Sequence, residues 1–277
     1  MFNSNLIFIG GYPRSGTTLM RAILDVHESI YCGPETRVVP MLLSYMQKIM
    51  RNAYELRELK NSGIQEKLNK AVALFIYSIM YNHGEKVARL CAKDPDLLYY
   101  IQYLRKLFPR AKFIYMVRDG RATAYSMLKQ NKEQLTFLRM RPYLQTWNTY
   151  AKQAVRNCES AGPDICLMVR YETLILHPKE TILKVMEFLN ETYTEDLLQH
   201  EKFIGDRIKL SPTEWSSDQV KKAIHRESLV EWIKNPVQGY DKAIIDRSVP
   251  MLKMLNYTDE TSKLDYFREY KLLSGIP

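Results

Sequence analysis

Residues 6–26 read LIFIGGYPRSGTTLMRAILDV, and this stretch decides the fold. Its first part, Leu6–Gly10, is a short run of β-forming apolar residues that predicts a buried strand. A glycine-rich turn follows, and from Thr17 to Val26 apolar residues recur at helical spacing. When such a turn connects a strand to a helix, its backbone N–H groups converge on one point at the helix N-terminus, where an anion can bind. The stretch therefore predicts a phosphate-binding loop.

The turn also carries side chains that can bind an anion. Arg14 offers a fork of hydrogen-bond donors. After it come Ser15, Gly16, Thr17 and Thr18, three of which carry hydroxyl groups. The spacing is similar to that of a Walker loop, but Thr17 stands where that loop has a lysine. Because that lysine contacts the γ-phosphate, its absence disfavours a P-loop kinase. The alternative to a phosphate-binding loop is a Gly/Ser turn with only a structural role.

Three further β-rich runs follow, and each is succeeded by a helical pattern. They are residues 87–92, 112–117 and 165–170. Strands that alternate with helices predict an α/β fold, in which a P-loop-like parallel sheet is flanked by helices on both faces. Ligands of such sheets bind beyond the carboxyl ends of the strands, so we expect the chemistry-bearing residues directly after each strand.

The segments between these runs complete one domain. Helices are predicted for residues 96–108, 141–161 and 178–189, and for a segment in which Leu68, Val72, Phe75, Ile76 and Ile79 share one face. Residues 204–220 are polar and lack a period, which indicates a long loop. We expect a single domain over residues 1–257 and a polar, poorly packed C-terminal tail over residues 258–277.

Composition limits the classes of partner. The chain has 277 residues and a formal net charge of +9, which favours an anionic partner such as a phosphorylated cofactor, an acidic peptide, a membrane surface or nucleic acid. The basic residues are scattered and form no nucleic-acid motif, so we expect no nucleic-acid partner. No apolar run is long enough to span a membrane, and residues 1–11 are typical of a strand rather than a signal peptide.

Several motifs follow one another in chain order. They are Pro13-Arg-Ser-Gly-Thr-Thr18, Cys32-Gly-Pro-Glu-Thr-Arg37, Cys91-Ala-Lys-Asp-Pro95, Met116-Val-Arg-Asp-Gly-Arg-Ala122 and Val169-Arg-Tyr-Glu-Thr173, followed by a loop with Ser211. Together they resemble the motifs of sulfotransferases that use 3′-phosphoadenylylsulfate (PAPS), and those of the tyrosylprotein (protein-tyrosine) branch in particular. The resemblance runs from about Leu6 to Tyr257. It implies an enzyme that transfers the sulfuryl group of PAPS to tyrosine hydroxyls in acidic contexts of secreted or membrane proteins.

The resemblance implies catalytic roles residue by residue. Glu35 is the expected general base, because attack by a tyrosine hydroxyl, whose pKa is about 10, benefits from a positioned base. Arg14, Lys93 and Ser211 are expected to stabilise the charge that moves to the leaving phosphate. Arg37 is expected to contact the substrate.

A larger set of residues is implied to bind PAPS or its product PAP. It comprises Arg14, Ser15, Gly16, Thr17 and Thr18 in the first loop, then Arg118, Ser126 and Tyr171, and finally Ser216, Ser217, Asp218, Gln219, Val220 and Lys222. The last six follow the pattern of the family's cofactor-covering loop, and residues 204–222 are called the covering loop below. No metal is expected in the chemistry.

The four cysteines admit two interpretations on their own. They are Cys32, Cys91, Cys158 and Cys166. They form no CxxC pair, which disfavours a zinc site, and four buried thiols are the plain interpretation. The resemblance instead implies two disulfides, Cys32–Cys91 and Cys158–Cys166, which require an oxidising compartment.

The resemblance also implies a location and an assembly. Relatives work as homodimers in the Golgi, held in the membrane by an N-terminal helix with the catalytic domain in the lumen. No such anchor or signal is visible in this chain. Two glycosylation sequons, at Asn190 and Asn256, are typical of proteins on the secretory route.

Three positions depart from the family pattern. Gln130, Trp215 and Met41 stand where relatives have arginine. Each change removes a cation that would face phosphate or an acidic peptide, and a lost charge-assisted hydrogen bond is worth roughly 1.5–3 kcal/mol. We therefore expect weaker PAPS binding and an altered peptide preference.

Two further functions stay open from the sequence. A sulfotransferase that acts on a carbohydrate or small molecule would share the phosphate loop, although Glu35 within its motif favours the tyrosyl branch. A degenerate protein that binds PAPS or PAP without catalysis would explain the lost arginines, although Arg14, Glu35, Lys93 and Ser211 argue for activity.

Overall fold

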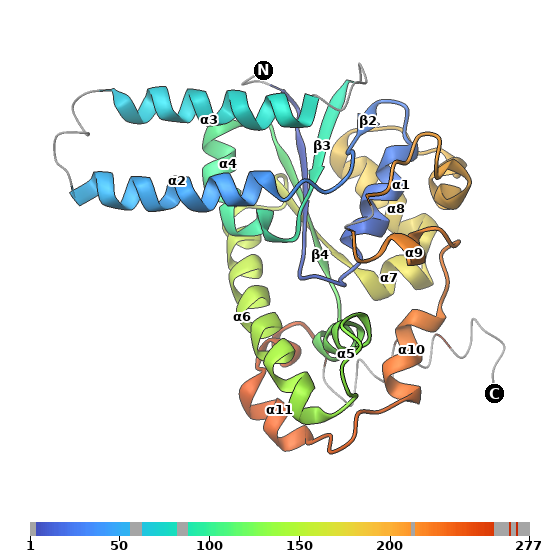
Figure 1. Cartoon of the computed structure of the whole chain (residues 1–277). Coiled ribbons are helices and arrows are strands. Elements are labelled where there is room, and N and C mark those ends of the chain that lie inside the picture. The colour runs from blue at the N-terminus through green and yellow to red at the C-terminus, as the bar shows by residue number, and fades with distance from the viewer. Residues whose placement is uncertain are drawn as a thin grey trace.

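The structure is a computed structural model that describes residues 4–55, 63–81, 88–211 and 214–257, together with Tyr266 and Tyr270. Its centre is a five-stranded parallel sheet in the order β2-β3-β1-β4-β5 (Figure 1). The strands are β1 (Ile7–Gly10), β2 (Ile30–Tyr31), β3 (Arg89–Lys93), β4 (Lys112–Val117) and β5 (Cys166–Arg170). The predicted α/β fold with a parallel sheet is therefore confirmed.

The sequence predicted four of the five strands. Val87, the first residue of one predicted run, lies outside the described residues. The strand that was missed, β2, has only two residues and pairs with β3 at the edge of the sheet. A run of two residues is too short to show a period, so no pattern in the sequence could identify it.

Helices cover both faces of the sheet (Figure 1). The N-terminal half contains α1 (Thr17–Val26), α2 (Val38–Glu55), α3 (Ile64–Tyr81), the 3-10 helix η2 (Pro95–Tyr100), α4 (Ile101–Leu107) and α5 (Gly120–Gln130). The C-terminal half contains α6 (Phe137–Ala161), α7 (Tyr171–Leu176), α8 (Pro178–Leu189), η3 (Glu195–Phe203), α9 (Ser217–Val220), α10 (Glu227–Lys234), α11 (Lys242–Ser248) and α12 (Met251–Met254). In the described part of the chain, none is both long and apolar enough to cross a membrane.

Alternation along β1 divides the core into two layers. Phe8 packs with apolar side chains of α4 and α6, whereas Ile7 and Ile9 pack with those of α1 and α8. Successive residues of a strand point to opposite faces, so a four-residue strand that is buried throughout serves both layers. The phosphate loop leaves the carboxyl end of this central strand, which fixes it against a rigid support.

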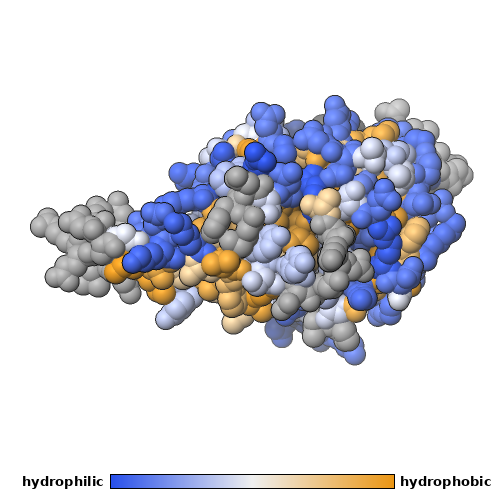
Figure 2. Space-filling model, turned by 90° about the horizontal axis from the view of Figure 1, so that it is seen from above, coloured by the Kyte–Doolittle hydropathy of each residue, from blue (hydrophilic) through white to orange (hydrophobic). Residues whose placement is uncertain are grey.

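Two helical predictions need correction. Residues 96–108 form not one helix but η2 followed by α4. On α3, Val72 and Ile76 are buried as expected, but Phe75 is 46% exposed and lies off the buried face. The projecting pair α2 and α3 carries apolar side chains on its surface (Figure 2).

The predicted C-terminal tail lies largely outside the described residues. Its two described residues, Tyr266 and Tyr270, are buried in a cluster with residues of α7 and α10. Trp232 Nε1 donates a hydrogen bond of 3.1 Å to the Tyr266 hydroxyl. The expectation of poor packing is wrong at these two residues, because aromatic rings supply the apolar contact that the polar composition concealed.

Candidate functional site

The phosphate loop has the backbone that an anion site needs. Gly16 caps α1 with a φ of 97°, and a Cβ atom at this position would lie 2.5 Å from Cδ2 of Tyr171. Only glycine fits there, because the left-handed conformation and the close approach both exclude a side chain. The Ser15 hydroxyl is buried and has no hydrogen-bond partner among the described residues. The loop thus presents a helix N-terminus and an unused hydroxyl group.

Arg14 joins three segments that are distant in sequence. Its Nε donates to Ser126 Oγ on α5 at 2.9 Å, and its Nη1 donates to the Trp215 carbonyl oxygen at 2.6 Å and to Ser216 Oγ at 2.9 Å. Burial, followed by repulsion from Arg118, lowers the pKa of Arg14 to about 10. The guanidinium therefore keeps its charge near neutral pH and holds the covering loop against the phosphate loop.

A second basic group lies beside Arg14. Arg118 Nη1 donates to the Arg14 carbonyl oxygen at 2.9 Å, and its guanidinium lies 4.4 Å from the centre of the Tyr171 ring. The Tyr171 hydroxyl lies 2.8 Å from Ser228 Oγ. A small cavity here is lined by Arg14, Gly16, Leu19, Arg118, Tyr171, Ile175, Ser216, Gln219, Val220, Lys222, Ala223, Ile224, His225 and Ser228. Most of the residues that the resemblance implied for the cofactor meet here, and Ser228 was missed.

Two implied cofactor residues of the covering loop lie elsewhere, and Ser15 and Ser126 likewise line neither this cavity nor the larger one described next. Ser217 Oγ donates to the carbonyl oxygens of Ser211 and Glu214, so it folds the covering loop onto itself. The Asp218 side chain is 97% exposed and pairs with Lys221. Neither residue lines the small cavity or the larger one described next.

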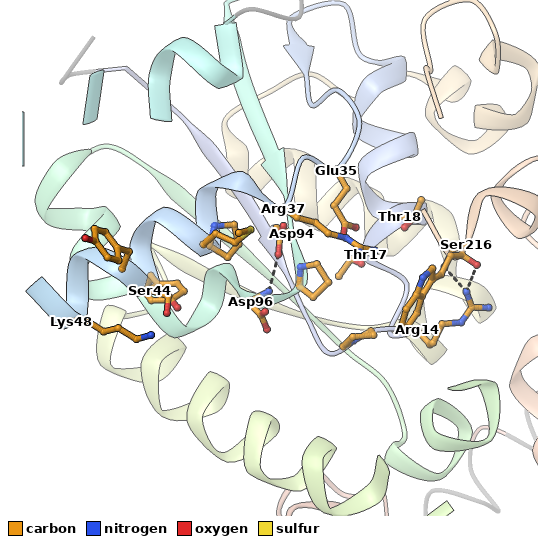
Figure 3. A pocket seen from close by; sticks show the side chains of 17 residues that line it. Arg14, Thr17, Thr18, Glu35, Arg37, Ser44, Lys48, Asp94, Asp96 and Ser216 are labelled. Carbon is orange, nitrogen blue, oxygen red and sulfur yellow. Dashed lines mark hydrogen bonds and ion pairs between the residues drawn. The ribbon is translucent and has the colours of Figure 1, made fainter. Parts of the chain in front are cut away.

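The larger cavity, called the main cavity, has a volume of about 860 Å³. Its lining residues are Pro13, Arg14, Thr17, Thr18, Glu35, Arg37, Pro40, Met41, Ser44, Tyr45, Lys48, Asp94, Pro95, Asp96, Tyr100, Trp215 and Ser216. Arg14 and Ser216 lie at one end, the loop end, and Ser44 and Lys48 of α2 lie at the other, the helix end (Figure 3). Glu35 and Arg37 lie between the two ends (Figure 3).

Lys93 is held between two carboxylates. It is buried at the end of β3, where its Nζ contacts Glu35 and lies 2.8 Å from Glu214 Oε1. Arg37 Nε donates to the other Glu35 oxygen at 3.0 Å. Of the catalytic residues that the resemblance implied, Arg14 and Glu35 line the main cavity, whereas Lys93 and Ser211 do not.

Glu214 is the main residue that the sequence reasoning missed. Its Oε2 accepts from Arg21 Nη2 at 3.0 Å and from the Ser211 backbone at 3.1 Å. Burial opposes the ionisation of Glu214, but Arg21 and Lys93 outweigh it and lower its pKa. Arg21 also pairs with Asp25 at 2.8 Å. An arginine that is fully buried in α1 requires acidic partners, but the sequence does not show this burial, so no signal in the sequence could have identified Glu214.

Both implied disulfides are present. Cys32–Cys91 joins the segment that carries Glu35 to the strand that ends at Lys93, across 59 residues. Cys158–Cys166 joins the end of α6 to β5. The first bond fixes the carboxylate segment relative to the lysine, and no cysteine of the chain is free.

Asp94 brings a second carboxyl group to the main cavity. One oxygen accepts from the Asp96 backbone at 3.2 Å, and the other is buried with no partner among the described residues. Burial, followed by repulsion from Glu35, raises the pKa of Asp94 to about 7. Burial and Glu35 also raise the pKa of Asp96.

The remaining predicted positions lie on the surface. Gln130 is exposed at the end of α5 and lines neither cavity, whereas Trp215 and Met41 both line the main cavity. Asn190 and Asn256, the two sequon residues, are exposed. The described residues contain no cluster of side chains that could hold a metal ion.

Comparisons with known proteins agree with this geometry. A family model described as "Sulfotransferase family" matches residues 6–195. Protein-tyrosine sulfotransferase A of Caenorhabditis elegans is 39% identical over 98% of this chain and 72% of its own length. Protein-tyrosine sulfotransferase 1 of Danio rerio is 42% identical over 95% of this chain and 75% of its own length. Among solved structures, the sulfotransferase domain from the Synechococcus PCC 7002 olefin synthase has a TM-score of 0.65 at 24% identity, covering 91% of this chain and 95% of that one.

Proposed function

The chain belongs to the sulfotransferase family, and on this premise we propose that it is a protein-tyrosine sulfotransferase that uses PAPS as its sulfuryl donor. The observation that carries the proposal is the main cavity, in which a phosphate loop with Arg14 meets a carboxylate, Glu35, that is backed by Lys93. Anion binding and proton removal are the two tasks of sulfuryl transfer to a hydroxyl group, and this cavity has groups for both.

The residues present fit an elongated polyanion such as PAPS. The buried hydroxyl of Ser15, which has no partner among the described residues, and the N-terminus of α1 suit one phosphate group. Arg14, Thr17 and Thr18 would hold the phosphosulfate end. Arg118, Ser126, Tyr171, Ser228 and Lys222 would hold the 3′-phosphate and the adenosine, because they surround the neighbouring small cavity or bond to Arg14.

The chain's own residues suit in-line transfer. When bound, PAPS supplies the sulfuryl group and leaves as PAP. Glu35 takes the proton of the substrate tyrosine, so that the phenolic oxygen can form its bond to sulfur while the bond from sulfur to the phosphate oxygen breaks. Arg14 places positive charge where the phosphate gains its negative charge. Lys93 and Arg37 each contact one Glu35 oxygen and so orient the carboxylate.

Glu214 acts as a positioning residue in this scheme. It bonds to Lys93, Arg21 and the Ser211 backbone at once, so it ties the covering loop to the lysine behind the base. Ser211, which does not line the main cavity, would act on the transferring group from the covering loop.

The cellular setting is a further part of the proposal. Two disulfides support an oxidising compartment, for which we propose the Golgi lumen. Exposed sequon residues, Asn190 and Asn256, are compatible with glycosylation there. We propose that the chain forms a homodimer, as the members of the family it resembles do. We also propose acceptor proteins with acidic residues near the tyrosine, for which Arg37 and Lys48 supply cations in the main cavity.

Transfer of radiolabelled sulfate tests the proposal. The purified chain is incubated with labelled PAPS and a tyrosine peptide that contains acidic residues, beside the same peptide with phenylalanine in place of tyrosine. Label on the tyrosine peptide alone is expected. No label, with PAP binding still seen by calorimetry, would overturn the tyrosine acceptor and leave a different acceptor or a binding protein.

A further inference from the structure

Two apolar side chains are exposed at the helix end of the main cavity. Met41 is 71% exposed and Tyr45 is 63% exposed, and both line the cavity. They stand four residues apart on α2, so they lie on one face of the helix, one turn apart. Single exposed apolar residues are common on protein surfaces. This pair, however, faces the cavity that also contains the candidate base Glu35, which points to a role in contacting a ligand. We call this pair the apolar shelf.

The charges around the apolar shelf are of both signs. The main cavity is lined by the cations Arg14, Arg37 and Lys48 and by the carboxyl groups of Glu35, Asp94 and Asp96. Arg14 is bonded to the covering loop at the opposite end of the cavity. At the helix end the cation is Lys48, which would meet an acidic side chain that reached it.

Arg37 is also engaged. Its Nε bonds to Glu35, and its guanidinium lies 5.9 Å from the centre of the Trp215 ring. A cation that is paired on one side and covered by an aromatic ring on another has less attraction left for an acceptor carboxylate. The cavity as a whole therefore offers an acceptor peptide apolar contact as well as charge.

We propose that the apolar shelf, Met41 and Tyr45, binds a large apolar side chain of the acceptor peptide within a few residues of the reacting tyrosine. The inference rests on the proposed function, whose cavity it subdivides. The occupant is a peptide segment because the apolar shelf is continuous with the cavity that holds Glu35, and an extended chain advances about 3.3 Å per residue along such a cleft. An apolar side chain there loses water-exposed surface without the cost of burying a charge.

Peptide selectivity tests the inference. In a set of peptides with one central tyrosine, each of the three positions on either side carries leucine, aspartate, lysine or serine in turn. At one position, leucine should raise kcat/KM by about tenfold or more over aspartate, which is the scale of burying one such side chain. The inference is overturned if aspartate or lysine is favoured at every position.

Variants locate the effect on the apolar shelf. Met41→Arg should abolish the leucine preference at that position and favour aspartate. Met254→Arg is the matched control, because Met254 is 69% exposed on α12 and lines none of the cavities described. An unchanged preference in Met41→Arg, or an equal change in Met254→Arg, would remove the apolar shelf as the cause.

A binding measurement separates this inference from the proposed function. The same peptides with phenylalanine at the central position cannot accept sulfate, and their affinity in the presence of PAP is measured by fluorescence anisotropy. If no tyrosine peptide is ever labelled but leucine still raises affinity in the wild type and not in Met41→Arg, the proposed function fails and the apolar shelf stands. If label is transferred but leucine gives no gain in affinity or turnover, the apolar shelf fails alone.

Discussion

The two ends of the main cavity are built in opposite ways. At the loop end, Arg14 and Thr17 are 8% and 5% exposed, and the arginine makes several hydrogen bonds. At the helix end, Met41 and Tyr45 are 71% and 63% exposed. Groups that face developing charge must be fixed before the reaction, whereas groups that select among peptides can adapt to them. Substitutions near the loop end should therefore lower kcat, and substitutions at the helix end should change selectivity.

The largest effect on turnover is expected at Glu35, which lies between the two ends of the main cavity. Glu35→Gln removes the proton acceptor but keeps the shape of the side chain, so kcat should fall by about 10²–10⁴. PAP affinity by calorimetry should change little. Glu28→Gln, at an exposed position after α1, is the control and should keep normal turnover. Near-normal kcat in Glu35→Gln would show that another group takes the proton.

Glu214→Gln tests how much the buried contacts behind Glu35 contribute to stability and to turnover. It leaves Lys93 and Arg21 without a shared carboxylate, and breaking a buried ion pair typically costs about 3–5 kcal/mol of the free energy of unfolding. Chemical denaturation measures the loss, with the exposed Glu187→Gln as control. A positioning role also requires kcat to fall more than KM rises under conditions where the variant is folded. A loss of stability with unchanged kcat would mean that Glu214 only supports the fold.

The two disulfides provide a matched pair of constraints. The Cys32–Cys91 loop of 59 residues should contribute about 4 kcal/mol to the free energy of unfolding, and the Cys158–Cys166 loop of 8 residues about 2.5 kcal/mol. We expect serine at both Cys32 and Cys91 to lower stability and also turnover, because that bond fixes Glu35 relative to Lys93. Serine at Cys158 and Cys166 should lower stability alone. Equal turnover in the two double variants would show that the first bond does not position the site.

The sequence could predict the site residues that belong to short local motifs, but not those whose role depends on a residue far away in the chain. Arg14, Glu35 and Arg118 follow strands or sit in turns, and backbone geometry restricts which residues such places accept, so short motifs identify them. Glu214 lies in an irregular loop, and its role depends on Arg21, 193 residues away in sequence. No local pattern reports such a pairing. Only the structure shows that Arg21 is buried on α1 and therefore needs an acidic partner.

Exposure was harder to predict than position. The sequence identified Met41 and Trp215 as lost arginines, but only the structure shows that both line the main cavity while Gln130 does not. Asp218 lies in a motif of the covering loop and yet faces solvent. A loop without a period gives no rule for which side chains point inward, so its members could be placed only by tertiary structure.

The smallest effect concerns the pH dependence of stability, through Asp94. Its pKa is raised from 3.8 to about 7 in the folded chain, so the folded state binds the additional proton between these values. Stability should therefore fall as the pH rises through that window, and Asp94→Asn should reduce the fall by at least about 1 kcal/mol between pH 4.5 and 7.5. Asparagine can still accept the hydrogen bond from the Asp96 backbone, so the start of η2 is kept. Asp25, whose pKa burial raises to about 6, contributes a fall in the same direction that the variant leaves in place. Denaturation at several pH values, with Asp218→Asn as the exposed control, measures the difference; parallel curves for the wild type and Asp94→Asn would mean that Asp94 is ionised across the whole range.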